Sequence, residues 1–421
     1  FVMELNEMTK DVKHSENHRY DFIYTNFDDE GNTLLAPDKI EFPVTVYQRP
    51  RKPAKIVQKG TGKSDLFILM YDDFEQEELE KAEKYIFLEY FIVEEGTMWN
   101  EILEILIRKA ENGVLVRLIY DDMGCFLLLP QNYPEQLQKY GIECAVFNPF
   151  RPVLTSTQNN RDHRKITIID GKVAFTGGIN LADEYINRKV RFGHWKDNAI
   201  AVRGDAVRSF VVMFLQMWNV SDKKAEYGSY LQIESTEQTE TGFVMPYGDS
   251  PLDNENVGQT VYMDIINRAE KYVHIMTPYL ILDNEMMKAL TYAAKRGVDV
   301  RIIMPHIPDK KYAYLLARSY YGELIRCGVR IYEYMPGFVH SKAFVSDGTK
   351  GVVGSINLDY RSLFLHFECA CYFYKNSVVE QIEQDMRETL KKCVEIKLDD
   401  CLKYNIFKQL AGRVLRLFAP L

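Results

Sequence analysis

The strongest constraint on this chain is a motif that occurs twice. His163-Arg164-Lys165 is followed by Asp170, and His340-Ser341-Lys342 is followed by Asp347, so both segments read His-x-Lys-x-x-x-x-Asp. One copy could arise by chance, because it fixes only three positions. A second copy 177 positions later, in a chain that repeats elsewhere, is strong evidence. We therefore expect each half to contribute one histidine and one lysine to a shared site for a phosphate ester.

The motif belongs to a wider internal repeat. The matching segments are Ala82–Ile86 with Ala269–Val273, Gly113–Ile119 with Gly297–Ile303, and Gly177–Asn180 with Gly354–Asn357. The offset falls from 187 to 177 between the first and last pairs, which indicates an insertion in the first half, within Pro149 to Asp162. Self-similarity at this length predicts a duplicated domain and not a solenoid.

Each half alternates between strand and helix patterns. Tyr85–Val93 is an apolar, aromatic-rich run that predicts a strand, and Trp99–Lys109 has the apolar spacing of a helix. Gly113 ends that helix, and Val114–Tyr120 predicts a buried strand. The same order recurs in the second half, at Tyr272–Leu282, Glu285–Lys295, Gly297 and Val298–Met304. The chain is thus expected to be α/β, with two similar domains, each a β-sheet flanked by helices.

The domain boundaries follow from composition. Residues 1–64 are polar and mixed and predict a lead-in segment. Residues 65–222 form the first predicted domain and 243–421 the second, joined by a polar stretch without periodicity. We expect the halves to pack about a pseudo-twofold axis, with the active site between them.

Bulk composition excludes several classes of protein. The net charge is −8 and no basic tract stands out in the first 400 residues, which argues against a nucleic-acid partner. Seven cysteines without a Cys-x-x-Cys indicate reduced thiols and no zinc site. The sequence has no 18-residue apolar run. Because the chain begins at Phe1 and not at methionine, we expect that upstream sequence is missing.

The chemistry of the motif follows from strand geometry. Residues two apart on a strand project from the same face, so His163 and Lys165 are expected to point into one pocket, as are His340 and Lys342. A neutral imidazole can attack phosphorus, and a protonated one can supply the leaving group's proton. The lysines would stabilise the phosphoryl charge, so neither metal nor cofactor is needed. Although they complete the catalytic motif, Asp170 and Asp347 are interpreted as anchors of the turns after each strand.

Other residues are expected to support this site. The small residues Gly178 and Ser355 let backbone approach an anion, and the amides of Asn180 and Asn357 can donate to phosphate oxygens. Both asparagines lie 17 positions after their histidine. A carboxylate commonly orients a reacting histidine. Asp197 and Glu368 are the best candidates for that role.

The paired motifs resemble those of the phospholipase D superfamily, and the flanking segments resemble bacterial cardiolipin synthases. The carrying segments are Asn160–Lys165, Gly177–Tyr185, Trp195–Asp197, Thr277–Tyr279, Arg318–Tyr321, Pro336–His340 and Asn357–Ser362. The resemblance implies two phospholipase D-like domains. It also implies transfer of a phosphatidyl group between two phosphatidylglycerol molecules, giving cardiolipin and glycerol. His163 would be the nucleophile and His340 the acid and later base.

The resemblance also implies a location and leaves alternatives open. Family members usually carry N-terminal membrane helices, so we expect a protein attached to the cell membrane and anionic lipids, with cytoplasmic catalytic domains. A phospholipase D-type hydrolase would use the same residues. A nuclease is disfavoured by the negative charge, and a non-catalytic lipid-binding scaffold is disfavoured by two intact motifs.

The last stretch, Tyr404–Leu421, predicts an amphipathic helix. Its apolar residues Ile406, Phe407, Leu410, Val414, Leu417 and Phe418 share roughly one face, and its basic residues lie elsewhere. The commoner explanation for such a helix is docking on the protein core. The alternative is a basic amphipathic helix on an anionic membrane surface. The sequence slightly favours the first.

Overall fold

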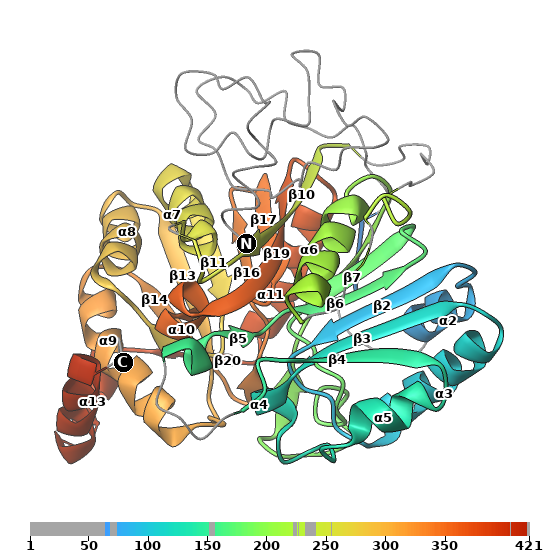
Figure 1. The fold of residues 1–421 in the computed structure, drawn as a ribbon. Helices are drawn as coiled ribbons and strands as arrows, with labels where there is room; N and C mark the ends of the chain where they lie inside the picture. The colour runs from blue at the N-terminus through green and yellow to red at the C-terminus, as the bar shows by residue number, and fades with distance from the viewer. Residues whose placement is uncertain are drawn as a thin grey trace.

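Two twisted sheets stand side by side, with helices on their outer faces and between them (Figure 1). The computed structural model describes residues 64–67, 74–150, 156–221, 225, 227–231, 241–253, 255–404 and 406–418. The predicted lead-in, 1–64, therefore lies outside the described residues except for Ser64, as does most of the predicted joint between the halves. The predicted α/β architecture with helix-flanked sheets is confirmed.

The first half contains a seven-stranded sheet. Its strands, in spatial order, are β1 (Ser64–Phe67), β9 (Ala199–Arg203), β7 (Val173–Gly177), β6 (Lys165–Ile169), β2 (Tyr85–Tyr90), β3 (Leu115–Asp121) and β4 (Ile142–Phe147). Its helices are α2 (Phe74–Glu80), α3 (Thr97–Glu111), α4 (Asp122–Cys125), α5 (Tyr133–Gln138), α6 (Val207–Val220) and the short 3₁₀ helix η2 (Ser156–Asn159). Strands β2, β3 and β4 are parallel, and β1, β9, β7 and β6 complete the sheet in antiparallel order.

The second half repeats this arrangement. Its strands, in order, are β10 (Phe243–Asp249), β19 (His366–Tyr374), β17 (Lys350–Gly354), β16 (Ala343–Ser346), β11 (Tyr272–Met276), β13 (Asp299–Pro305), β14 (Arg330–Tyr334) and β20 (Cys393–Ile396). Its helices are α7 (Val257–Arg268), α8 (Asn284–Lys295), α9 (Lys311–Arg326), α10 (Tyr360–Phe364), α11 (Val378–Leu390), α12 (Leu398–Lys403) and α13 (Ile406–Phe418). Among the described residues, no helix combines the length and apolar character needed to cross a bilayer.

The segment Tyr272–Leu282, predicted as one strand, forms two separate strands. It breaks after β11 and resumes as β12 (Leu280–Ile281), which pairs with β18 (Leu358–Asp359). The Thr277 hydroxyl donates to the Tyr279 carbonyl and accepts the Leu358 N–H, so the chain turns at Thr277-Pro278. Proline cannot donate to a sheet ladder, which explains why the strand does not continue.

An apolar core joins the two halves. Helix α6 is buried on most of its surface, packing against β6 and β7 of its own sheet and β10 of the other. Helix α11 of the second half reciprocally contacts β1 of the first. The same core takes Phe210 and Phe214 from the first half and Val353 and Phe373 from the second. Burial of this surface makes the halves one body, which a site shared between them requires.

Both motif aspartates hold turns. Asp170 and Asp347 adopt positive φ angles of 53°. The Asp170 carboxylate accepts the backbone N–H groups of Glu83, Lys84 and Tyr85 at 2.7–2.8 Å. Asp347 does the same for residues 270–272. These contacts tie each motif strand to the start of the neighbouring one, β2 or β11, so neither carboxylate faces the histidines.

We predict that Asp170→Ala lowers stability without altering the chemistry. Three charge-assisted hydrogen bonds are lost at a largely buried site, which should reduce the free energy of unfolding by about 2–4 kcal/mol. Thermal unfolding measures this loss, with the exposed neighbour Lys172→Ala as control. The anchoring role would be contradicted by an Asp170→Ala protein that melts like wild type.

Candidate active site

His163 is held by the opposite half of the molecule. The short strand β5 (Arg161–Asp162) precedes it and pairs in parallel with the start of β19. The His163 N–H donates to the Phe367 carbonyl at 2.9 Å. Its Nδ1 lies 2.9 and 3.0 Å from the two carboxylate oxygens of Glu368, the next residue on β19.

His340 is held in the same way, with the halves exchanged. Strand β15 (Gly337–Val339) precedes it and pairs in parallel with β8 (His194–Lys196) of the first half. The His340 N–H donates to the Lys196 carbonyl at 2.7 Å, and its Nδ1 lies 2.6 Å from Asp197 Oδ2. The two imidazole–carboxylate pairs therefore cross the boundary between the halves in opposite directions.

The expected placement of the motif on strands needs correction. His163 precedes β6, and both His340 and Lys342 precede β16. The backbone N–H of each histidine is used in the bridge to the other half, so it is not available to a ladder of its own sheet. The short strands β5 and β15 fix the histidines instead.

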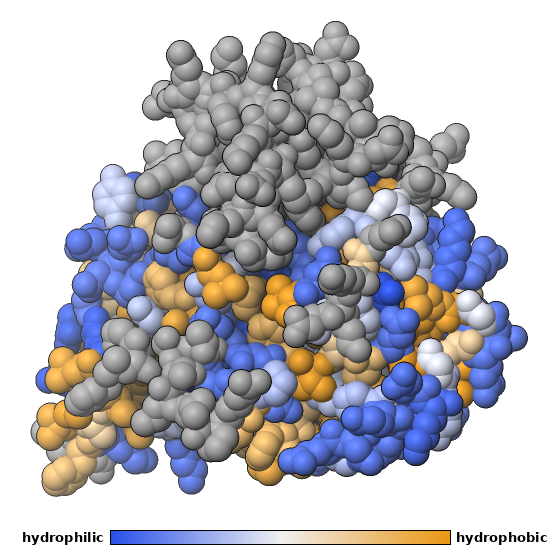
Figure 2. Space-filling model, viewed as in Figure 1, coloured by the Kyte–Doolittle hydropathy of each residue, from blue (hydrophilic) through white to orange (hydrophobic). Residues whose placement is uncertain are grey.

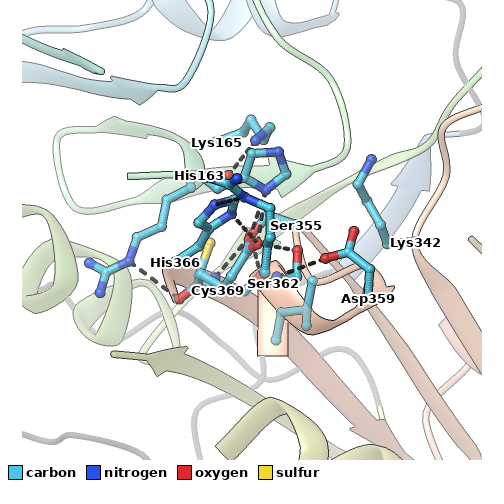
Figure 3. Close-up of polar contacts among 12 residues, drawn as sticks. His163, Lys165, Lys342, Ser355, Asp359, Ser362, His366 and Cys369 are labelled. Atoms are coloured by element: carbon cyan, nitrogen blue, oxygen red, sulfur yellow. Dashed lines mark hydrogen bonds and ion pairs between the residues drawn. The ribbon is translucent and has the colours of Figure 1, made fainter. Parts of the chain in front are cut away.

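The two carboxylates are held by different donors. Glu368 accepts the Ser355 hydroxyl at 2.5 Å and the Ser362 hydroxyl at 2.6 Å. In Figure 3 these serines lie below His163 and His366, while Lys342 lies to the side next to Asp359. Asp197 accepts the Asn198 N–H at 2.9 Å and the Trp195 indole N–H at 3.3 Å. Both carboxylates are buried and fully engaged.

These surroundings keep both carboxylates ionised. Burial alone would raise their pKa values, but His163 and Lys165 beside Glu368, and His340 and Lys342 beside Asp197, lower both. An ionised carboxylate can only accept hydrogen bonds, so each neutral imidazole carries its proton on Nδ1. That leaves the Nε2 lone pair of each histidine for chemistry.

Burial and neighbouring lysines act on the histidines. Burial holds the pKa of His163 well below its usual value, although Glu368 opposes this. Burial and Lys342 lower the pKa of His340 to about 4, although Asp197 opposes this. Both imidazoles are therefore neutral near pH 7 before substrate binds.

The lysines are buried in the same centre. Burial lowers the pKa of Lys165 to about 8 and that of Lys342 to about 7, the latter with a contribution from Lys165. Lys165 also lowers the pKa of His340 in the opposite half. Each ammonium donates to the backbone carbonyl of its own histidine. Lys165 of the first motif thus acts electrostatically on both His340 and Lys342 of the second, which indicates that the two motifs share one site.

The predicted phosphate contacts of the two asparagines and of Gly178 and Ser355 have different outcomes. Asn180 is not directed at a ligand, because its amide donates to the Tyr185 hydroxyl at 2.7 Å and its oxygen accepts the Ile92 N–H at 3.0 Å. Asn357 differs, since its buried Oδ1 has no partner among the described residues. An anion does lie against Gly178, but it is the carboxylate of Asp197 and not a bound phosphate. A Cβ added at Gly178 would lie 2.0 Å from Asp197 Oδ1. Ser355 occupies the matching position and bonds Glu368 directly.

Two residues of the site, Ser362 and Trp195, were missed from the sequence. Ser362 follows Asp359, which caps α10, and this turn aims its hydroxyl at Glu368. Trp195 lies two positions before Asp197 and packs 5.2 Å from the His340 ring. His366 occupies the matching place two before Glu368, 5.5 Å from the His163 ring. The available sequence signal was that Trp195 and His366 each lie two positions before a candidate carboxylate. This signal can be interpreted only when the structure shows that β5 and β15 pair with strands of the opposite half.

One cluster could hold a metal ion. His163, His366 and Glu368 each offer one ligand atom, and the three atoms lie within 4.8 Å of one another. Two imidazole nitrogens and a carboxylate oxygen suit zinc or a similar transition metal. The same Glu368 oxygens already accept two hydroxyls and the His163 N–H, which a bound cation would disturb.

Comparison with known proteins fits this geometry. The profile of the family described as "Cardiolipin synthase, PLD-like domain" matches residues 76–218 and 262–390, one match in each half. The chain belongs to this family within the phospholipase D superfamily. It is 38% identical over 345 residues to cardiolipin synthase 2 of Bacillus anthracis, covering 82% of this chain and 67% of that one. An uncharacterized protein of Streptococcus mutans is 54% identical over 346 residues, covering 82% and 75%.

Solved structures show the same fold. The crystal structure of phosphatidylserine synthase from Haemophilus influenzae Rd KW20 superposes with a TM-score of 0.66 at 15% identity, covering 85% of this chain and 92% of that one. Polyphosphate kinase from Porphyromonas gingivalis superposes with a TM-score of 0.54 at 15% identity, covering 85% of this chain and 53% of that one. At these identities the likeness concerns the fold alone.

We predict that Glu368→Gln and Asp197→Asn each impair turnover strongly. An amide in place of the carboxylate can donate to Nδ1, which moves the imidazole proton to Nε2. By analogy with other carboxylate–histidine pairs, kcat should fall about 10²–10⁴-fold. Ser362→Ala is the matched control, since it removes one hydrogen bond to Glu368 and keeps the tautomer, so its loss should stay below about tenfold. Turnover of Glu368→Gln within about threefold of wild type would contradict the assignment.

We predict that the fall of kcat/KM with rising pH becomes steeper above about pH 7–8. This parameter reports ionisations of the free enzyme, in which His340, with a pKa of about 4, must still gain the proton that the first step uses. The lowered pKa values of about 7 for Lys342 and about 8 for Lys165 mean that both lysines lose their charge in this range, while the phosphodiester stays anionic. The acid limb should lie below pH 6.5, because His163 must be neutral and its pKa is lowered. A rate profile measures both limbs, and a steady rise of kcat/KM up to about pH 10 would contradict the lysine assignment.

Proposed function

We propose that this chain is a cardiolipin synthase that transfers a phosphatidyl group from one phosphatidylglycerol to another and releases glycerol. The observation that carries the proposal is the crossed arrangement of His163–Glu368 and His340–Asp197, which makes two neutral histidines available to one phosphodiester. The family match and the cardiolipin synthases among its relatives supply the substrate class.

In the first step, His163 Nε2 attacks phosphorus and the bond from phosphorus to the glycerol oxygen breaks. His340 gives its Nε2 proton to the departing oxygen, so glycerol leaves and a phosphatidyl-histidine remains. The bound phosphodiester carries a negative charge, which raises the pKa of His340 and supplies the protonated form that this step needs. Glu368 stabilises the positive charge that develops on His163.

In the second step, a hydroxyl of the second phosphatidylglycerol attacks the same phosphorus. His340, now neutral, takes the hydroxyl proton, and the bond between phosphorus and His163 breaks. Cardiolipin forms and both histidines return to their starting states. Lys165 and Lys342 offset the charge on the phosphoryl oxygens, so we propose that neither step requires a metal ion.

A product assay tests the proposed function. Purified protein with phosphatidylglycerol in mixed micelles should yield equal amounts of cardiolipin and glycerol, and added chelator should leave the rate unchanged. Phosphatidic acid as the sole lipid product would assign a phospholipase D-type hydrolase instead. Chelator inhibition that is reversed by a divalent ion would refute the metal-free mechanism.

We predict that the two histidine variants fail at different steps. A phosphatidyl ester of p-nitrophenol has a leaving group that needs little acid assistance. With this substrate, His340→Ala should release a burst of about one p-nitrophenolate per active site and then stall, because no base activates the acceptor. His163→Ala should show no burst. Mass spectrometry should locate the phosphatidyl group on His163, and a burst from His163→Ala would reverse the roles of the histidines.

A further inference from the structure

The C-terminal helix α13 packs on the body through its less apolar side. Gly412 is buried, and an added Cβ there would lie 2.6 Å from the Leu315 carbonyl of α9, so the two helices approach closely. The Arg416 guanidinium lies 4.1 Å from the Tyr320 ring and 3.0 Å from Glu323 Oε2. A glycine, an arginine and the partly buried Leu415 thus form a contact in which a fully apolar face would usually lie.

The apolar side of α13 faces outward. Leu410, Val414 and Leu417 are 59%, 46% and 77% exposed, and their spacing of four and three places them on one face. Figure 2 shows apolar residues at the lower left corner, where Figure 1 places this helix. A helix that served only to complete the core would turn this face inward, so the exposed stripe points to a surface beyond the described residues.

The helix that carries this stripe is basic. It holds Lys408, Arg413 and Arg416 and no acidic residue, although the whole chain has a net charge of −8. At 100° per residue, the exposed Arg413 lies about 70° from the centre of the stripe, at its edge, whereas the exposed Lys408 lies about 150° from it. An apolar face on a basic helix, with an arginine at its edge, complements a bilayer that contains anionic phospholipid.

A second exposed apolar group lies at the edge of the active site. Helix α4 follows Asp121, whose carboxylate accepts the N–H of Asp162, the residue before His163. Leu127 just beyond α4 is 90% exposed, and the partly exposed rings of Phe126 and Phe150 pack 5.4 Å apart. Figure 1 shows both α4 and α13 in the lower part of the view.

We propose that the outer face of α13 docks on an anionic phospholipid bilayer, with Leu410, Val414 and Leu417 inserted at the boundary of headgroups and acyl chains. The helix lies in the membrane plane and turns the α4 edge, beside His163, toward the lipid. The choice of anionic lipid as partner rests on the proposed function, whereas the exposed stripe does not.

Vesicle binding of the full chain tests the proposal. Co-sedimentation is measured with vesicles of phosphatidylglycerol and phosphatidylcholine in equal parts. The triple variant Leu410→Gln, Val414→Gln and Leu417→Gln should bind about tenfold or more weakly, because apolar insertion is lost while glutamine preserves the helix. The matched control, Leu252→Gln, Tyr292→Gln and Val394→Gln, changes three similarly exposed apolar residues elsewhere and should bind as wild type.

A charge variant tests the lipid class. Arg413→Gln should weaken binding to these vesicles about fivefold and have no effect with pure phosphatidylcholine. Equal binding of the triple variant and wild type would overturn the proposal. A triple variant that loses an oligomeric state in light scattering would also overturn it, because the stripe would then belong to a second copy of the chain.

Activity separates this proposal from the proposed function. His163→Ala should bind vesicles like wild type and produce no cardiolipin. The α13 triple variant should keep wild-type turnover in mixed micelles, where docking is not required. If wild type makes no cardiolipin but the triple variant still loses vesicle binding, the docking surface stands and the proposed function fails.

Discussion

The paired contacts between each motif histidine and a carboxylate of the opposite half organise the whole molecule. His163 depends on Glu368 and His340 depends on Asp197, so neither half has a complete imidazole–carboxylate pair alone. The bridges β5–β19 and β8–β15, together with the core around α6, hold the halves in the one arrangement that satisfies both pairs. Folding of the interface and assembly of the site are therefore the same event.

The two sides of this site are related but not interchangeable. On one side Asp197 lies so close to Gly178 that a side chain there would collide with it. On the other, the longer Glu368 accepts the Ser355 hydroxyl from the matching position. Trp195 beside Asp197 can only donate, whereas His366 beside Glu368 can donate or accept. These differences give each histidine its own environment, which suits the two distinct steps of the proposed mechanism.

The sequence predicted the motif residues and the two α/β halves because the internal duplication presents each pattern twice. The repeated motif identified both histidines and lysines, and the alternation of strand and helix patterns predicted the α/β halves. Asp197 and Glu368 were also predicted, because a carboxylate commonly orients a reacting histidine. The crossing of β5 and β15 into the opposite half was not predictable, because bridges of two or three residues carry no periodicity. The structural role of Asn180 was also missed, because its two partners, Tyr185 nearby and Ile92 88 positions away, come together only in the fold.

The protonation of the two buried lysines depends on whether an anion occupies the site. Burial favours the neutral amine, which lowers the pKa of Lys342 to about 7 and that of Lys165 to about 8. A bound anion would reverse this preference, because its charge stabilises both ammonium groups and a protonated His340. In the mechanism proposed above, the bound phosphodiester thereby supplies the proton on His340 that the departing oxygen receives. The buried positive charge of the free site favours binding of an anion for the same reason.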